Sequence, residues 1–196
     1  MSSIVDDLKM QYQYGGVAFR LIFWNVFCFL VSLLFFYDFR LGIFNLPTWI
    51  ALSSDPNLLI TKPWTLISYA FFHHGVGHLF FNMMVLHFSS MLFLTFFNSK
   101  QFMGLYLLSA LFSGVAFVVG YYFLQMNSSM VGASGAIMAI LVATTAYRPL
   151  MTVRLLFFGN VKLWHITALI LVLDFMQFRI ENTGGHIAHL GGALFG

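Results

Sequence analysis

Charged residues are scarce in this sequence. Asp, Glu, Lys and Arg make up 8% of its 196 residues, whereas 60% are hydrophobic and the mean hydropathy is +0.88. Soluble domains are roughly one quarter charged, and one aqueous core cannot bury this much apolar surface. The composition therefore excludes an ordinary soluble domain and predicts a polytopic membrane protein. In lipid each apolar run must satisfy its own backbone hydrogen bonds, which predicts an all-α fold.

Cysteine is nearly absent. The single Cys28 lies within an apolar run, which excludes a disulfide framework and a metal site built from cysteines. Basic residues are few and dispersed: nine Lys and Arg against six Asp and Glu give a net charge of +3, and no basic run suggests a nucleic-acid partner. Residues 1–13 lack the pattern of a cleaved signal peptide, so we expect the first apolar run to remain as a membrane helix.

Six apolar runs predict six transmembrane helices in a single membrane domain covering residues 1–196. The expected spans are residues 17–37, 78–97, 102–124, 134–147, 163–178 and 184–196. The fourth span is short for a bilayer crossing of about 20 residues, so we expect its first residue to lie at depth, in a cavity. The sixth run stops at Gly196, and we expect an incomplete last helix, either cut off or continued in a longer chain.

The segment between the first two spans, residues 38–76, carries tryptophans and turn residues yet is too apolar for a free loop. It is expected to lie in the membrane interface and to pack on the helices. A cytoplasmic N-terminus places six of the nine basic residues inside and Arg40, Lys62 and Arg179 outside, which satisfies the positive-inside rule. We therefore expect a multi-pass protein of the cell (inner) membrane with its N-terminus in the cytoplasm.

A serine between small residues begins the fourth span, in the motif Gly132-Ala133-Ser134-Gly135. The glycines allow a close approach of other groups, and the helix start offers unpaired N–H groups to a developing negative charge. Taken alone, the pattern is more often a helix-packing motif. Other polar residues in the spans must therefore decide between the two interpretations.

Two of these polar residues are His78 and Asn82, which lie four residues apart and so project from one face of the second span. Polar groups inside spans are costly and by default indicate a site, although the pair also fits an interhelical hydrogen bond. A third is His189 in the sixth run. It lies within a stripe of small residues that matches a stripe on the fourth span; the two sets are Ala188, Gly192, Gly196 and Gly135, Ala139, Ala143.

Facing stripes of small residues let two helices approach closely, which predicts contact between His189 and Ser134. A serine hydroxyl is a poor nucleophile without a base, and imidazole is suited to take its proton and return it to a leaving amine. His78, Asn82 and the backbone N–H of Ser134 would bind the oxyanion. Because no carboxylate is spaced to orient His189, we expect a Ser–His dyad and not a triad.

These residues resemble the rhomboid intramembrane serine proteases. The resemblance rests on three motifs, His78-Leu79-Phe80-Phe81-Asn82-Met83, Gly132-Ala133-Ser134-Gly135 and Ala188-His189-Leu190-Gly191-Gly192 with Gly196, in this order on the second, fourth and sixth spans. It implies a six-helix rhomboid-like bundle in which Ser134 is the nucleophile and His189 the general base. It also implies an oxyanion site at His78, Asn82 and Gly132, and helix packing through Gly135, Gly192 and Gly196.

The implied reaction is hydrolysis of peptide bonds in or next to transmembrane segments of other membrane proteins within the lipid bilayer. No metal, nucleotide or other cofactor is implied. One departure is the Trp64-Thr65 pair, where the family often carries Trp-Arg, so any salt-bridge role of that Arg is absent.

The remaining polar residues are assigned smaller roles. His73 and His74 precede the second span and are candidates for lining the cavity. His186 lies one turn before His189, but only His189 has glycine at the third and seventh following positions. For Asp174 we expect an interfacial position or a partner on a neighbouring helix in preference to catalysis.

Three alternative functions have weaker support in the sequence. Seven histidines invite a metal-dependent membrane enzyme, but His-Glu-x-x-His is absent and the pair His74 and His78 lacks the further clusters that a di-iron oxidase needs. Aspartyl chemistry needs two aspartates within spans, and only Asp174 qualifies. A non-proteolytic rhomboid-like protein that binds transmembrane clients typically lacks the serine or the histidine, and both are present. This client-binding function is the alternative to the protease.

Overall fold

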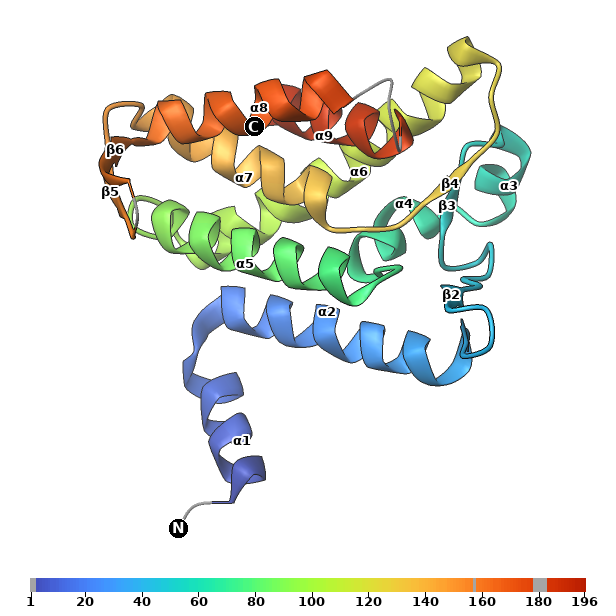
Figure 1. Ribbon diagram of the computed structural model, residues 1–196, viewed down its shortest axis with the longest axis horizontal. Helices are drawn as coiled ribbons and strands as arrows, with labels where there is room; N and C mark the ends of the chain where they lie inside the picture. Colours follow the sequence, from blue (N-terminus) through green and yellow to red (C-terminus); the bar gives the residue numbers. More distant parts are fainter. Residues whose placement is uncertain (1–2, 157, 178–182) are drawn as a thin grey trace.

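The computed structural model describes residues 3–156, 158–177 and 183–196, and these are mostly helical (Figure 1). The helices are α1 (Ile4–Tyr14), α2 (Gly16–Phe35), α3 (Pro56–Thr61), α4 (Thr65–Ser68), the 3₁₀ helix η1 (Tyr69–Phe71), α5 (Val76–Phe93), α6 (Ser99–Leu124), α7 (Ser134–Tyr147), α8 (Leu163–Gln177) and α9 (Thr183–Phe195). The strands are β1 (Tyr37–Asp38), β2 (Ile43–Phe44), β3 (Leu52–Ser53), β4 (Ser129–Met130), β5 (Thr152–Leu155) and β6 (Gly159–Lys162).

A helix forms in each of the six predicted spans, namely α2, α5, α6, α7, α8 and α9. Among the described residues, α2, α5 and α6 are long and apolar enough to cross a membrane, while α7 and α8 are shorter apolar helices. These helices indicate an integral membrane protein. The last residue of the predicted fifth span, Phe178, and the basic residue Arg179, which we expected outside, lie beyond the described residues.

The helix ends follow from local sequence. Asn98 accepts hydrogen bonds from the backbone of Lys100 and Gln101 at the start of α6, and the side chain of Gln101 accepts from the backbone of Asn98 in return. This capping box satisfies N–H groups that would otherwise lack partners. Arg20 of α2 donates to the carbonyl oxygens of Tyr12 and Gln13 at 3.1 Å, which ties the end of α1 to α2.

The all-α prediction missed three short antiparallel ladders, β1–β2, β3–β4 and β5–β6. The first two contain two residues per strand, too few to show an alternating pattern in the sequence. The β5–β6 hairpin closes the loop between α7 and α8 at the end of the molecule opposite the β3–β4 pair (Figure 1). The ladders matter because β3–β4 fixes the chain that leads into α7.

The segment between α2 and α5 packs on α6, as predicted. Tyr69 of η1 donates to the carbonyl oxygen of Ala110 at 2.8 Å, and Tyr106 of α6 donates to the carbonyl oxygen of Ala70 at 3.1 Å. Both tyrosines are buried, so each hydrogen bond forms where water does not compete. The reciprocal pair holds η1, and with it the chain entering α5, against the middle of α6.

The close approach of α7 and α9 depends on glycine. A Cβ added to Gly192 would overlap the carbonyl oxygen of Gly135, and one added to Gly196 would overlap that of Ala139. A Cβ added to Gly135 would come within 2.6 Å of Ser113 Oγ on α6. The small residues of α7 and α9 therefore face each other, and the two backbones touch.

Candidate active site

Ser134 is the first residue of α7, and two contacts hold the chain that leads to it. Leu52 of β3 pairs with Met130 of β4, and the amide of Gly132 donates to the carbonyl oxygen of Tyr69 at 2.9 Å. Gly132 also has φ +135°, a conformation that favours glycine. These contacts fix the turn before α7 and thereby the position of the serine.

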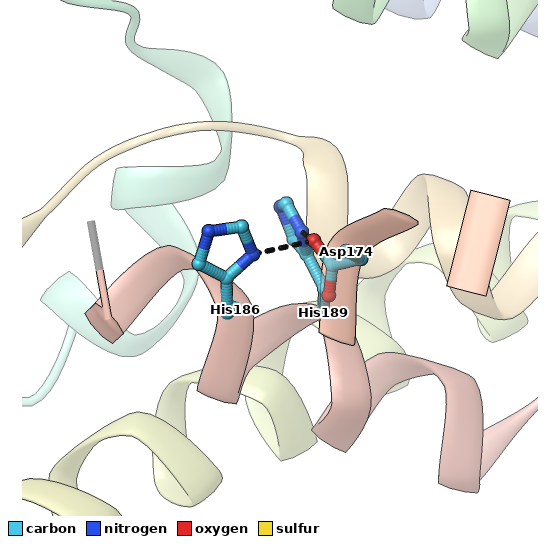
Figure 2. Close-up of side chains that lie close together, drawn as sticks. All are labelled: Asp174, His186 and His189. Carbon is cyan, nitrogen blue, oxygen red and sulfur yellow. Dashed lines mark hydrogen bonds and ion pairs between the residues drawn. The ribbon is translucent and has the colours of Figure 1, made fainter. Parts of the chain in front are cut away.

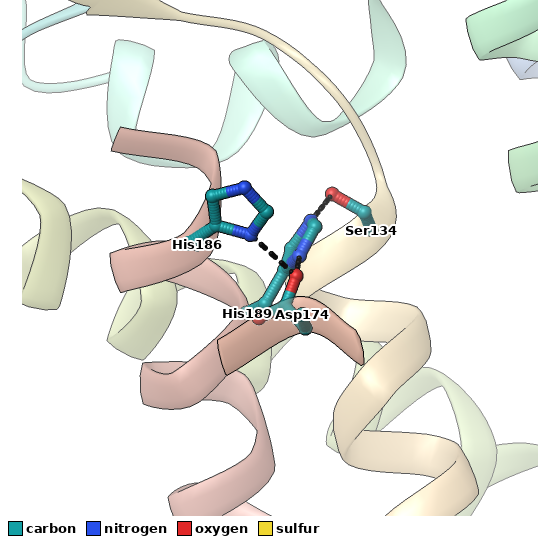
Figure 3. Close-up of polar contacts among 4 residues, drawn as sticks. All are labelled: Ser134, Asp174, His186 and His189. Carbon is teal, nitrogen blue, oxygen red and sulfur yellow. Dashed lines mark hydrogen bonds and ion pairs between the residues drawn. The ribbon is translucent and has the colours of Figure 1, made fainter. Parts of the chain in front are cut away.

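His189 of α9 reaches Ser134 across the glycine contact. Its Nε2 lies 2.6 Å from Ser134 Oγ, within hydrogen-bond distance (Figure 3). Gly192 follows His189 by one helical turn and Gly135 follows Ser134 directly, so the backbone contact between these glycines sets the separation of the two side chains. The structure thus brings together the two residues that the sequence motifs selected.

The expectation that no carboxylate orients His189 was wrong. Asp174 of α8 lies with Oδ1 2.5 Å from His189 Nδ1 and 2.7 Å from His186 Nδ1 (Figure 2). The sequence could not reveal this contact, because no motif or stripe of small residues links Asp174 on α8 to the histidines of α9. The suggested partner on a neighbouring helix is therefore found, and the partners are the two histidines of α9.

A polar cavity of about 530 Å³ opens above the serine. Ser134, His189, His78 and Asn82 all line it, as do His74, His186 and Asp174. Asn82 donates one amide hydrogen to the carbonyl oxygen of His78 at 2.8 Å, which leaves its second amide hydrogen for another acceptor. The cavity can therefore hold a peptide carbonyl close to the serine and to several polar donors.

Gly132, which was expected in the oxyanion site, has a different role in this structure. Its N–H is engaged by Tyr69 and is not free in this structure to bind an oxyanion. A Cβ at this position would come within 2.8 Å of His78 Cε1 and 2.9 Å of His78 Nε2. In this structure the glycine makes room for the His78 ring, which the sequence motif alone could not show.

Two more histidines surround His78. The ring of His74 lies 4.5 Å from that of His78, centroid to centroid, and the ring of His73 lies 4.9 Å away. His74 lines the cavity, whereas His73 is fully buried behind it. Burial, reinforced by the neighbouring histidines, lowers the pKa of His73 to about 3, so this ring is neutral at physiological pH. Neither ring nitrogen of His73 has a hydrogen-bond partner among the described residues.

One cluster among the described residues has the donor types of a metal site. Asp174, His186 and His189 place one ligand atom each within 4.8 Å of one another. In this structure the same atoms are joined by hydrogen bonds. A metal on His189 Nδ1 would put the ring proton on Nε2, the atom that faces Ser134, so metal binding and a base role for His189 exclude each other.

The apolar helices indicate an integral membrane protein, and a serine, a histidine and a carboxylate meet at its polar cavity. Residues 61–196 match the family model of the rhomboid domain. The chain therefore belongs to the rhomboid family, whose members are usually intramembrane serine proteases acting on membrane proteins in the bilayer. A comparison with curated proteins gave no match.

Proposed function

We propose that this protein is a serine endopeptidase that hydrolyses peptide bonds in or next to the transmembrane segments of other membrane proteins. The observation that carries the proposal is the 2.6 Å contact between Ser134 Oγ and His189 Nε2 in a polar cavity. A half-buried serine that served packing alone would have no need of an imidazole on a neighbouring helix. The family match adds that relatives usually perform this chemistry.

The reaction begins when Ser134 Oγ attacks the scissile carbonyl carbon while its proton passes to His189 Nε2. The resulting oxyanion accepts hydrogen bonds from Asn82 and His78, which line the same cavity. The carbon–nitrogen bond then breaks, and the imidazolium returns the proton to the leaving amine. Water from the cavity hydrolyses the acyl-enzyme by the reverse proton path, which regenerates the Ser134 hydroxyl.

An apolar hollow beside the serine suits a transmembrane substrate. It measures about 240 Å³ and is formed by side chains of α5, α7 and α8, namely Phe81, Asn82, Val85, Ser134, Ile137, Met138, Leu141 and Ile170. Asn82 and Ser134 line both this hollow and the polar cavity. We propose that apolar side chains of a substrate occupy the hollow while its unwound backbone enters the polar cavity.

The proposed membrane arrangement has six spanning helices, a single domain and a cytoplasmic N-terminus. Lys9, Arg20, Lys100, Arg148, Arg154 and Lys162 then lie on the cytoplasmic side, where the positive-inside rule places basic residues. Ser134 would lie towards the opposite face, at the start of the short helix α7. Water would thus reach the cavity from outside the cell membrane.

The proposal is tested with purified protein in liposomes and a single-span reporter whose transmembrane helix carries Gly and Ala near its outer end. A matched reporter carries Leu at those positions and should resist cleavage, since its helix does not unwind. Cleavage of the first reporter should disappear in Ser134→Ala. Cleavage that persists in this variant would exclude Ser134 as the nucleophile.

A further inference from the structure

The carboxylate of Asp174 is shared by two histidines. Its Oδ1 lies 2.5 Å from His189 Nδ1 and 2.7 Å from His186 Nδ1, and both histidines belong to α9 whereas Asp174 belongs to α8 (Figure 2). The carboxylate is 8% exposed, and its Oδ2 has no hydrogen-bond partner among the described residues. Its polar interactions within this part of the chain are thus directed to the two rings.

An ionised carboxylate accepts hydrogen bonds and cannot donate them. The short contact with Asp174 therefore requires a hydrogen on His189 Nδ1. A neutral imidazole has one N–H, so Nε2 then carries a lone pair, and this is the atom 2.6 Å from Ser134 Oγ. Asp174 thereby selects the tautomer in which His189 can act as a base (Figure 3).

We infer that Asp174 is a positioning residue for the proposed hydrolysis, which fixes the tautomer and orientation of His189 and stabilises the imidazolium that forms. The inference rests on the proposed function of Ser134 and His189. During the reaction the proton moves from Ser134 Oγ to His189 Nε2 and on to the leaving amine. Asp174 keeps its charge throughout.

The cost of burying a carboxylate supports this role. A charged group inside a membrane helix is expensive and marks function more often than packing, because an apolar residue would join two helices at lower cost. In α8, Asp174 is the one acidic residue among largely apolar neighbours. Both donors that compensate its charge lie within one turn of α9.

The second donor, His186, has a different role from His189. It contacts the carboxylate but lies on the far side of it from Ser134 (Figure 3). Its N–H supplies the additional hydrogen bond that holds Asp174 in place and offsets its burial. Loss of His186 leaves the contact between Asp174 and His189 possible, whereas loss of the carboxylate removes it.

The test compares Asp174→Asn with the control His186→Asn in the liposome cleavage assay. Asparagine has the shape of aspartate but lacks the charge that selects one tautomer, so we expect kcat to fall about 10³-fold to 10⁴-fold with little change in KM. His186→Asn removes one hydrogen bond outside the proton path and should lower kcat by less than about tenfold. If Asp174→Asn fails to fold, Asp174→Glu takes its place in the test. This variant keeps the carboxylate and should retain part of the activity of the parent protein.

A second readout does not depend on turnover. The ¹⁵N chemical shifts of His189 should report a proton on Nδ1 in the parent protein and a mixture of tautomers in Asp174→Asn. Folded Asp174→Asn with kcat within tenfold of the parent, or an unchanged tautomer, would overturn the inference while leaving the serine protease intact. A parent protein that shows no activity would instead count against the proposed function, and the chemical shifts would still test the role of Asp174.

Discussion

The carbonyl oxygen of Gly135 occupies the space that a Cβ on Gly192 would need, so α7 and α9 meet backbone to backbone. Gly135 directly follows the proposed nucleophile, and Gly192 lies one turn after the proposed base. The two catalytic side chains are therefore brought together by a contact that involves no side chain.

Gly192→Ala should destabilise the protein by about 1–3 kcal/mol, because the new methyl group forces the two helices apart. A displacement of about 1 Å between Ser134 and His189 should also cost roughly 10²-fold in kcat. Both effects are measured on protein in detergent, by thermal unfolding and reporter cleavage. Gly104→Ala is the matched control, since a Cβ on that glycine of α6 meets nothing within 4 Å. Equal behaviour of the two variants would contradict the packing argument.

Asn82→Ala should lower kcat by about 10²-fold to 10³-fold, which is the usual cost of removing one oxyanion donor. KM should change little, because the hydrogen bond strengthens only as the oxyanion forms. Steady-state cleavage of the reporter separates the two constants. Asn57→Ala, an exposed change on α3, should leave both unaltered. A rise in KM with unchanged kcat would assign Asn82 to substrate binding.

His73 should make the protein sensitive to acid. Its pKa is lowered to about 3 by burial, whereas an unfolded histidine titrates at 6.5. Below pH 6.5 the unfolded chain takes up a proton that the folded chain excludes, so the free energy of unfolding decreases as the pH falls from 6.5 towards 3. At pH 5 the loss amounts to about 2 kcal/mol.

His73→Leu removes this titration and should weaken the pH dependence of thermal unfolding between pH 7.5 and pH 5. Since neither nitrogen of His73 has a partner among the described residues, an apolar side chain should be tolerated there. His87→Leu, at an exposed position of α5, serves as the control. An unchanged pH dependence in His73→Leu would show that another group senses acid.

Chelators should leave activity intact, while zinc should inhibit. The donor atoms of Asp174, His186 and His189 are already joined by hydrogen bonds. Zinc on His189 Nδ1 would leave the ring proton on Nε2, so that this nitrogen could no longer accept the proton of Ser134. His186→Asn removes one metal ligand and should raise the half-inhibitory zinc concentration at least about tenfold. Activity that EDTA abolishes and zinc restores would indicate a metal-dependent enzyme instead.

The sequence was sufficient to predict a helix in each of the six expected spans and the pairing of Ser134 with His189, but not the helices α1, α3, α4 and η1. The helices follow from apolar runs, which need no tertiary information. The pairing follows from small residues at four-residue spacing, because such stripes encode close contact between two helices. The three motifs, on the second, fourth and sixth spans, then indicated the rhomboid family.

The contact between Asp174 and His189 could not be predicted from the sequence. No motif links Asp174 to His189, since the contact depends on how α8 packs on α9 and not on spacing along the chain. The same holds for the amide of Gly132, whose partner Tyr69 belongs to a segment 63 residues earlier (132 − 69). Contacts of this kind are set by tertiary packing and leave no periodic signal.

The most direct test of the central claim is labelling of the membrane-embedded protein by a fluorophosphonate probe, with the modified peptide located by mass spectrometry. The variants are Ser134→Ala, His189→Ala and the control Ser129→Ala, which removes a serine that lines the same cavity. We predict label on Ser134 in the parent and in Ser129→Ala, and none in the other two variants. Absence of label from the parent, or label that survives in Ser134→Ala, would contradict an activated serine at this position and favour a client-binding protein without protease activity.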